Sequence, residues 1–448
     1  MPRSRGGPAP QGARGRSGVH PGVPVRGAET VRRWLLIFED SHWRSLRPLT
    51  DLVPVPSLVF GSSNLAARWA RATRLPVLAV LTRPGLSARP LGPHEVGSPE
   101  RGDTVVVANA AALPGPWVER ALEDGPGVLF SAGGRVAAAL VEHSKLQPVL
   151  ARGGNLETFL LGAGLESQPI EARMITYPWE LIGWNAEAIA ADLADEPGAI
   201  FGHVHPRAAV VEPRRVTVEP GARVDPLAVL DGRAGPVWIG PRAEVLAQTV
   251  VVGPCAVGAG TQLLGGVIGR STFGPQCRVA GEVEECVWQG YANKRHHGFV
   301  GHSAIGEWVN LGALTTTSDL KNNYGVVRMH VEGRTVDSGT RKIGSLVGAH
   351  VKTGIGTLLP TGAWIGVGSN LFGGGRFVPK VVPPFSWWDG ERFEEHRLEA
   401  FLETARAAMG RRERSLSAAE EETLRRWFEV TAEERAATFG AAAGRAVR

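Results

Sequence analysis

Cysteine is scarce in this chain of 448 residues, and no apolar run approaches the length of a membrane span. A bilayer-spanning helix needs ~20 apolar residues, so we expect no contact with a membrane. Cys255, Cys277 and Cys286 are too few for the disulfide framework of a secreted scaffold, and we interpret them as small buried hydrophobic residues rather than metal ligands. The N-terminal segment also lacks the apolar stretch of a signal peptide. These absences together predict a protein of the reducing cytoplasm.

Acidic residues are nearly absent from the start of the chain. Residues 1–33 hold seven arginines and a single acid, Glu29, so this segment carries a net charge of +6, whereas the remainder carries about −1. The positive charge therefore gives no reason to expect nucleic-acid binding by the folded body. Residues 1–30 are rich in Gly, Pro, Ser and Arg, which predicts a disordered basic tail. Either a mis-assigned start codon or a nucleic-acid-binding arm explains such a tail.

Aliphatic residues recur at a spacing of six in the second half of the chain. The runs are Ile239, Val245, Val251, Val257 and Leu263; then Phe299, Ile305, Leu311 and Thr317; then Val347, Thr353, Leu359, Ile365 and Leu371. The period fits neither an α-helix nor a simple strand and is typical of a hexapeptide-repeat β-helix, in which each flat side of a coil takes about six residues. No single coil closes its own core, so the coils must stack. We predict a parallel β-helix over residues 201–388.

The region before the repeats alternates short apolar runs with helical stretches. Residues 34–38, 76–81 and 104–108 are predicted as buried strands, and residues 64–73 and 184–193 as helices. This alternation favours an α/β domain with a mostly parallel, Rossmann-like sheet over residues 31–200.

The repeat is interrupted once at length and ends at a proline pair. Residues 318–342 break the period and are predicted to be a loop that leaves the prism, where binding and catalytic groups are common. After Pro383-Pro384, residues 389–448 are expected to form C-terminal helices at about 391–410 and 417–428. The second helix would be capped by Ser417, with Glu420 three residues later.

Histidines gather at a junction between repeats. His296, His297 and His302 lie just before the predicted loop. A histidine held beside a groove can act as a general base near neutral pH. The alternative is that all three are rim histidines with satisfied hydrogen bonds. The spacing gives no confident metal site, because the first two are adjacent and no cysteine or carboxylate lies at ligand spacing.

Long strings around this junction resemble a known family. They are Gly290–His296, Ile305–Gly312, Leu320–Tyr324, Lys352–Ile355 and Pro384–Trp387, with looser matches at Phe38–Asp40, Arg47–Thr50 and Tyr177–Ile182. The chain resembles the sugar nucleotidyltransferases that join a nucleotidyltransferase-like domain to a left-handed β-helix. These are relatives of the bifunctional N-acetylglucosamine-1-phosphate uridyltransferase/glucosamine-1-phosphate acetyltransferase.

The resemblance implies a homotrimer of parallel prisms with acetyl-CoA bound in the grooves between them. His296 takes the position of the catalytic histidine and would act as general base. The matching substrate contacts are Glu282, Asn310, Asn323, Tyr324 and Lys342. For Asn310 the alternative is an asparagine ladder within the prism, and for Lys342 it is a solvated loop charge. Glu284 replaces a lysine of the family that would contact the sugar phosphate.

The N-terminal domain departs further from the family pattern. Nucleotidyl transfer needs a glycine-rich loop to cradle phosphates, and the first strand is followed instead by residues 39–48, which contain no glycine. Arg44 and Arg47 could supply positive charge there, and Asp40 could hold Mg²⁺ or serve as a turn carboxylate.

These observations predict a transferase of sugar-nucleotide metabolism. The β-helix would transfer an acetyl group to an amino sugar that carries a phosphate or nucleotide, and the N-terminal domain would be a sugar-1-phosphate nucleotidyltransferase or its relic. The alternative is a non-catalytic sugar-nucleotide sensor or scaffold with degenerate sites.

Overall fold

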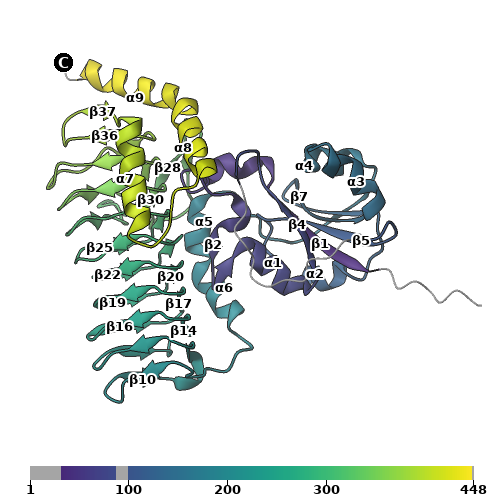
Figure 1. Cartoon of the computed structure of the whole chain (residues 1–448), viewed down its shortest axis with the longest axis horizontal. Coiled ribbons are helices and arrows are strands. Elements are labelled where there is room, and N and C mark those ends of the chain that lie inside the picture. The colour runs from purple at the N-terminus through teal and green to yellow at the C-terminus, as the bar shows by residue number, and fades with distance from the viewer. Residues whose placement is uncertain (1–31, 87–98, 446–448) are drawn as a thin grey trace, which may run out of the picture.

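The computed structural model describes residues 32–86 and 99–445 and places an α/β domain against the side of a long β-helix (Figure 1). The predicted basic tail at residues 1–30 lies outside the described residues. Within the described ranges, no helix is both long enough and apolar enough to cross a membrane.

The N-terminal domain is built on one six-stranded sheet with helices on both faces. In spatial order the strands are β4 (Val77–Leu81), β1 (Arg33–Phe38), β5 (Thr104–Asn109), β7 (Arg135–Glu142), β6 (Val128–Ala132) and β8 (Glu166–Pro169). The central pairs β1–β4 and β1–β5 are parallel, and β7 runs antiparallel to both of its neighbours. The predicted α/β class is confirmed, and the sheet is mixed.

Alternating side chains of β1 explain the two helical layers. Leu35 and Ile37 pack into the core beneath one set of helices, whereas Leu36 and Phe38 pack into a second core beneath the other set. Successive strand residues point to opposite faces, so a fully apolar strand must be covered on both sides. The helices are α1 (Leu65–Thr73), α2 (Pro116–Ala121), α3 (His143–Ala151), α4 (Leu156–Gly162), α5 (Pro178–Gly183) and α6 (Asn185–Asp192).

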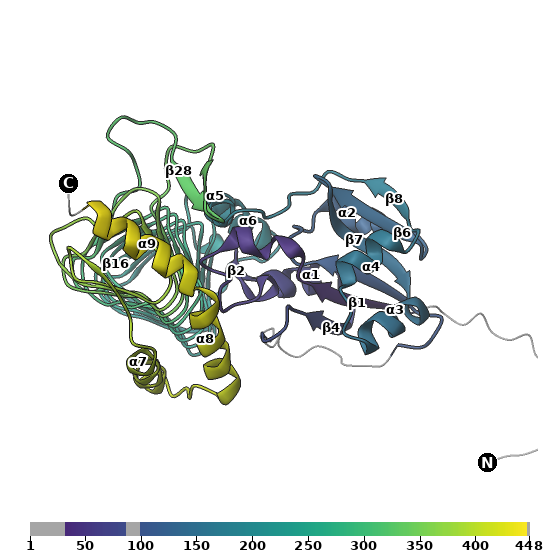
Figure 2. The ribbon, with the colours of Figure 1, turned by 90° about the horizontal axis from the view of Figure 1, so that it is seen from above.

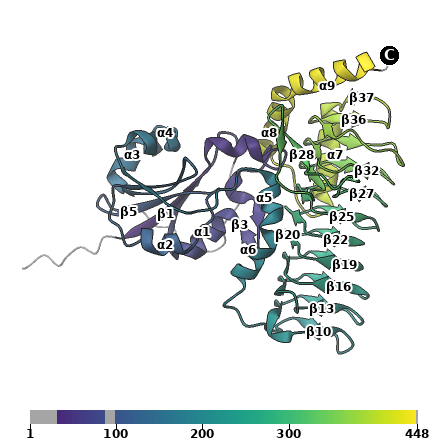
Figure 3. The same cartoon turned by 180° about the vertical axis from the view of Figure 1, so that it is seen from behind.

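The β-helix consists of parallel sheets on three sides of a prism (Figure 3). The longest is β11 (Val216–Val218), β14 (Val237–Ile239), β17 (Cys255–Val257), β20 (Thr272–Phe273), β23 (Val287–Trp288), β26 (Ala304–Ile305), β30 (Ser345–Val347), β33 (Ala363–Ile365) and β35 (Val381–Val382). The second is β10 (Ala209–Val211), β13 (Val229–Asp231), β16 (Thr249–Val252), β19 (Gly266–Gly269), β22 (Glu282–Glu284) and β25 (Phe299–Gly301). The third is β9 (His203–Val204), β12 (Arg223–Val224), β15 (Glu244–Val245), β18 (Gln262–Leu263), β21 (Arg278–Val279) and β24 (Asn293–Lys294). Further strands complete the upper coils: β27 (Thr316–Thr317), β32 (Leu358–Leu359), β31 (Lys352–Thr353), β34 (Asn370–Leu371), β36 (Ser386–Trp388) and the antiparallel β37 (Phe393–Glu395).

The six-residue period corresponds to the inward side chains. All five residues of the first predicted run are completely buried, and those of the third run are buried as well. The second run is wrong at one position, because Val300 rather than Phe299 points inward. Val300 stacks in register on the buried Val283 of the coil below and is followed after five residues, not six, by Ile305. The prediction of a parallel β-helix is confirmed, and its left-handedness stays a prediction.

The segment predicted as a loop contains an antiparallel hairpin, β28 (Arg328–Val331) and β29 (Arg334–Asp337) (Figure 2). Its buried residues Val327, Met329 and Val331 join the same hydrophobic core as β1 and α1. The hairpin therefore packs between the two domains and joins their hydrophobic cores.

Three helices follow the prism: α7 (Leu398–Gly410), α8 (Ala418–Val430) and α9 (Ala432–Arg445). The predicted capping box is present, because the Ser417 Oγ accepts from the Glu420 N–H and the Glu420 carboxylate accepts from the Ser417 N–H. The first helix begins later than predicted, since residues 393–395 form β37. Figure 2 shows α9 lying across the end of the prism and α8 at its edge, on the side of the N-terminal domain.

The aromatic stack at one corner of the prism predicts acid sensitivity. The His350 ring lies 6.3 Å from that of Trp308 and is buried, and burial lowers its pKa to about 3. Unfolded His350 binds a proton below about pH 6.5, whereas the folded residue does not until about pH 3, so the free energy of unfolding falls as the pH drops between these values. At pH 5 the free energy of unfolding should be about 2 kcal/mol lower than at neutral pH because of His350.

His350→Phe keeps an aromatic ring in the stack. It should remove the part of the stability loss at low pH that comes from protonation of His350 in the unfolded chain. We expect denaturant unfolding of the variant to differ less between pH 7 and pH 5 than that of the parent chain. Equal pH dependence of the two proteins would contradict the assignment to His350.

Candidate functional site

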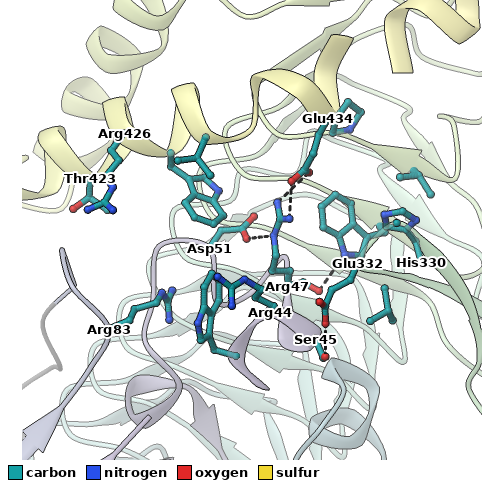
Figure 4. Close-up of a pocket in the computed structure, with 18 of the residues that line it drawn as sticks. Arg44, Ser45, Arg47, Asp51, Arg83, His330, Glu332, Thr423, Arg426 and Glu434 are labelled. Atoms are coloured by element: carbon teal, nitrogen blue, oxygen red, sulfur yellow. Dashed lines mark hydrogen bonds and ion pairs between the residues drawn. The ribbon is translucent and has the colours of Figure 1, made fainter. Parts of the chain in front are cut away.

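A cavity of about 920 Å³ lies where the N-terminal domain, the hairpin and the C-terminal helices meet (Figure 4). The 3₁₀-helix η1 (Ser41–Leu46), which directly follows β1, supplies Trp43 and Arg44. Arg83 follows β4, the hairpin supplies His330 and Glu332, and α8 supplies Arg426 and Trp427. The carboxyl ends of two neighbouring parallel strands therefore open toward the cavity, which is where open α/β sheets bind ligands.

Two arginines give this cavity unpaired positive charge. The Arg44 guanidinium lies 4.7 Å from the centre of the Trp43 ring, and neither Arg44 nor Arg426 is within ion-pair distance of a carboxylate among the described residues. Arg83 also lies over Trp43, but its charge is paired with Glu39. The unpaired Arg44 guanidinium over an indole ring, with Arg426 in the same cavity, suits an anion attached to a flat or ring-shaped group.

Arg47 lines the cavity, but all its guanidinium nitrogens are engaged. Nε donates to Asp51 at 2.6 Å, and the two terminal nitrogens donate to Glu434 at 2.7 and 3.1 Å. The guanidinium also lies over the rings of Trp364 and Trp427. Arg47 therefore joins the end of η1 to α9 and to the prism, and two carboxylates already neutralise the charge that the sequence offered for a nucleotide contact.

The Asp40 carboxylate is also fully engaged in contacts within the protein. It is buried, its Oδ2 accepts from Arg135 at 2.6 Å and from Asn109 at 2.9 Å, and its Oδ1 accepts from the His42 backbone N–H at 3.1 Å. The carboxylate is thus the N-cap of η1, which is the alternative that the sequence left open.

The surroundings of Asp40 do not fit Mg²⁺. Ligand atoms of Asp40, His42 and Glu157 lie within 4.8 Å of one another. Mg²⁺ prefers an octahedron of oxygen ligands, whereas this group offers one ring nitrogen and two carboxylates, of which that of Asp40 is already neutralised by Arg135. The predicted Mg²⁺ site is therefore not supported by these residues.

His296 lies on the surface of the prism, at the corner between β24 and β25. His296 and His297 are both exposed, and the Lys294 ammonium donates to the His296 carbonyl at 2.7 Å. Burial lowers the pKa of Lys294 to about 8. Glu282 is exposed on β22, directly beside Phe299 of β25. His296 lines neither the cavity of Figure 4 nor the cavity that contains His302.

The other predicted contacts are spread along the prism. The Asn310 side chain accepts from Asn293 at 2.8 Å in a ladder between coils. The Asn323 side chain caps the Gly325 N–H, and Tyr324 is largely exposed. Lys342 is exposed and lines a second cavity with His302, away from Arg44 and Arg426. One copy of the chain thus does not gather the predicted acetyl-transfer residues into one pocket.

Sequence reasoning missed Trp43, Arg83, Trp427 and Arg426. Arg83 follows a predicted strand, so its position at the sheet's carboxyl edge could have been inferred. No sequence signal placed α8 over that edge, because the contact joins residues more than 300 positions apart.

Residues 35–195 match the family model described as sugar nucleotidyl transferase. A relative from Sulfurisphaera tokodaii, a bifunctional sugar-1-phosphate nucleotidylyltransferase/acetyltransferase, is 37% identical over 93 residues, which are 21% of this chain and 23% of the relative. The bifunctional protein GlmU of Methanococcus vannielii is 31% identical over 146 residues, 32% of this chain and 30% of the relative. The chain thus spans less than a third of each of these relatives. The matches confirm the family resemblance predicted from the sequence.

A solved structure, the Arabidopsis UDP-N-acetylglucosamine acyltransferase, aligns with 47% of this chain and 77% of its own at 14% identity and a TM-score of 0.20. A score this low supports no conclusion about function.

Proposed function

We propose that this chain is a transferase of sugar-nucleotide metabolism. Its β-helix transfers an acetyl group from acetyl-CoA to an amino sugar that carries a phosphate or nucleotide, and its N-terminal domain binds a sugar nucleotide. One observation carries the proposal: a domain that matches the sugar nucleotidyl transferase family is joined to a parallel β-helix in a single chain, and the similar bifunctional proteins pair these two activities in their names.

In the proposed reaction, His296 takes a proton from the amino group as its nitrogen attacks the carbonyl carbon of the thioester. A carbon–nitrogen bond forms and the carbon–sulfur bond breaks. The thiolate of coenzyme A leaves and takes the proton from His296. Glu282, Asn310, Asn323, Tyr324 and Lys342 are proposed to contact the substrates in the assembled protein.

A homotrimer would supply the groove that one prism lacks beside His296. Four large apolar side chains each expose more than half of their surface on the upper coils: Leu314, Ile355, Phe372 and Phe377. The Leu314 N–H donates to the His297 carbonyl, and the Gly356 N–H donates to the Ala313 carbonyl on the next coil. The exposed apolar strip therefore begins at the corner that carries His296, where contact with a second copy of the chain would bury it.

In the N-terminal domain, binding without turnover is a second candidate function. Asp40 is neutralised by Arg135, and the loop after β1 offers no glycine for phosphate contact. Arg44 and Arg426 can still hold the phosphates of a sugar nucleotide. We propose sugar-nucleotide binding in the cavity of Figure 4, without metal-dependent nucleotidyl transfer.

The cytoplasm is the proposed location. The three cysteines are free and buried, and burial raises the pKa of Cys255 and Cys277 to about 12, which makes them inert thiols. No role with nucleic acid or membranes is proposed for the folded body.

Calorimetric titration of the whole protein tests both halves of the proposal. Acetyl-CoA should bind with micromolar affinity, and a nucleoside diphosphate sugar should bind at the N-terminal cavity. Arg44→Ala and Arg426→Ala should each weaken sugar-nucleotide binding by about 10-fold or more, because a charge-assisted hydrogen bond contributes about 1.5–3 kcal/mol.

Acetyl-CoA binding should be unchanged in both variants. Arg152→Ala, at an exposed arginine remote from the cavity, is the matched control. Sugar-nucleotide binding without acetyl-CoA binding would favour the sensor and refute the acetyltransferase.

A further inference from the structure

A second cavity, of about 530 Å³, lies between the N-terminal domain and the prism, next to the segment that follows the hairpin. One wall comes from α5 and its C-cap and consists of Trp179, Glu180, Ile182, Gly183 and Trp184. Glu285 and His302, at stacked corners of the prism, form the second. Residues 338–343, on the segment that returns from the hairpin, form the third. The cavity is separate from the corner that carries His296 and from the cavity of Figure 4.

His302 is held in a fixed orientation. Its Nδ1 lies 2.7 Å from the Asp319 carboxylate, and the residue is 8% exposed. The hydrogen bond from His302 holds the pKa of Asp319 below its usual range, and the charge of Lys342 adds to the effect. An ionised carboxylate only accepts hydrogen bonds, so Nδ1 carries the hydrogen, and Nε2 is an acceptor whenever the ring holds a single proton.

Nε2 faces a second acceptor. The Glu285 Oε2 lies 3.5 Å from it, and the other oxygen of that carboxylate accepts from Arg270 at 2.8 Å. A separation of 3.5 Å is too long for a strong direct hydrogen bond. Two acceptors that line the same cavity at this spacing match a ligand group with several N–H donors, of which a primary ammonium is the simplest.

The opposite wall carries positive charge. Arg341 and Lys342 are exposed side chains that line the cavity, and no described carboxylate lies within ion-pair distance of either. Trp179 and Trp184 add apolar ring surface to the lining, and the Glu180 carboxylate between them accepts from the backbone N–H groups of Thr176 and Tyr177. The cavity therefore has an acceptor end, a cationic end and an indole surface between them.

We propose that this cavity is a binding site for a zwitterionic small molecule. Its primary ammonium donates to His302 Nε2 and Glu285 Oε2, and its phosphate or carboxylate pairs with Arg341 and Lys342. Asp319 and Arg270 are positioning residues, because they act through His302 and Glu285. The binding site stands on its own contacts, and only the choice of an amino sugar as the probe rests on the proposed function.

Glucosamine 6-phosphate is the test ligand, titrated calorimetrically into the full-length protein in the presence of EDTA. Glucose 6-phosphate lacks the amine and glucosamine lacks the phosphate, so they are the matched ligands. The zwitterion should bind at least 10-fold more tightly than either. Similar affinities for all three ligands, or no binding of the zwitterion, would overturn the proposal.

Variants locate the site. Glu285→Gln and Asp319→Asn should each weaken binding of the zwitterion by 10-fold or more, and Arg341→Met, at an exposed position outside the proposed acetyl-transfer contacts, should do the same. Glu284→Gln changes the neighbouring carboxylate, which lies outside this cavity, and should have no effect. If Glu285→Gln and Arg341→Met both bind like the parent, the ligand lies elsewhere and the site is refuted.

Parallel titration with acetyl-CoA separates this inference from the proposed function. Loss of acetyl-CoA binding in the parent protein would refute the acetyltransferase while zwitterion binding remained. Loss of zwitterion binding alone would refute this cavity as a site.

Discussion

Replacing His296 with alanine is expected to lower the rate of acetyl transfer by a factor of about 10²–10⁴, which is the usual contribution of a positioned general base. The His296 side chain is exposed and makes no hydrogen bond or ion pair with the described residues, so truncating it should leave the fold unchanged. Its carbonyl, which Lys294 holds, is retained in the variant. The measurement is kcat for thiol release from acetyl-CoA with an amino-sugar phosphate acceptor.

The control is His297→Ala, at the adjacent exposed histidine of the same corner. It should keep turnover within a few fold of the parent and should sediment as the same oligomer. A His296→Ala protein that turns over at the parental rate would remove His296 as the base. Equal losses in both variants would instead indicate that the corner serves assembly rather than proton transfer.

Replacing Arg47 with alanine is expected to lower the free energy of unfolding by about 3–5 kcal/mol, because it leaves a buried charge without its partner. The Asp51 side chain is fully buried and is paired with Arg47 at 2.6 Å. The same guanidinium holds Glu434 of α9 and packs against Trp364 and Trp427. Denaturant unfolding measures the loss, and hydrogen exchange should show α9 opening first.

A second substitution separates charge from packing. Arg47→Ala combined with Asp51→Ala removes both buried charges, so the double variant should be more stable than Arg47→Ala alone. If the double variant is less stable by the sum of the two single losses, the effect lies in packing around the indoles rather than in the uncompensated Asp51 carboxylate.

The β-helix was predictable because its signal is local and repeated. Each inward position of a coil must hold a residue that fills a narrow apolar prism, and the next coil repeats the requirement. The prediction was wrong at Phe299, where a short corner moves Val300 inward. A fixed six-residue period does not detect a corner that is one residue shorter. The pairing of Val300 with the buried Val283 determines which residue points inward there.

Candidate residues were harder to predict because their neighbours decide what they do. The sequence marks Asp40, Arg44 and Arg47 equally as charged residues after the first strand. In the structure Asp40 forms an ion pair with Arg135, and Arg47 forms ion pairs with Asp51 and Glu434. Arg44 instead lines a cavity. Those partners come from distant segments, and no local pattern encodes them.

The sequence by itself determined the layers: an α/β sheet covered on both faces, a stack of parallel coils and capped terminal helices. These follow from periodicity, which acts between residues a few positions apart. Only the tertiary structure decided that the hairpin shares the core of β1 and that α8 and α9 close over the sheet edge. It also decided that His302 lies against Asp319. Such contacts depend on how whole surfaces fit together, and that information is spread over the entire chain rather than held in any one segment.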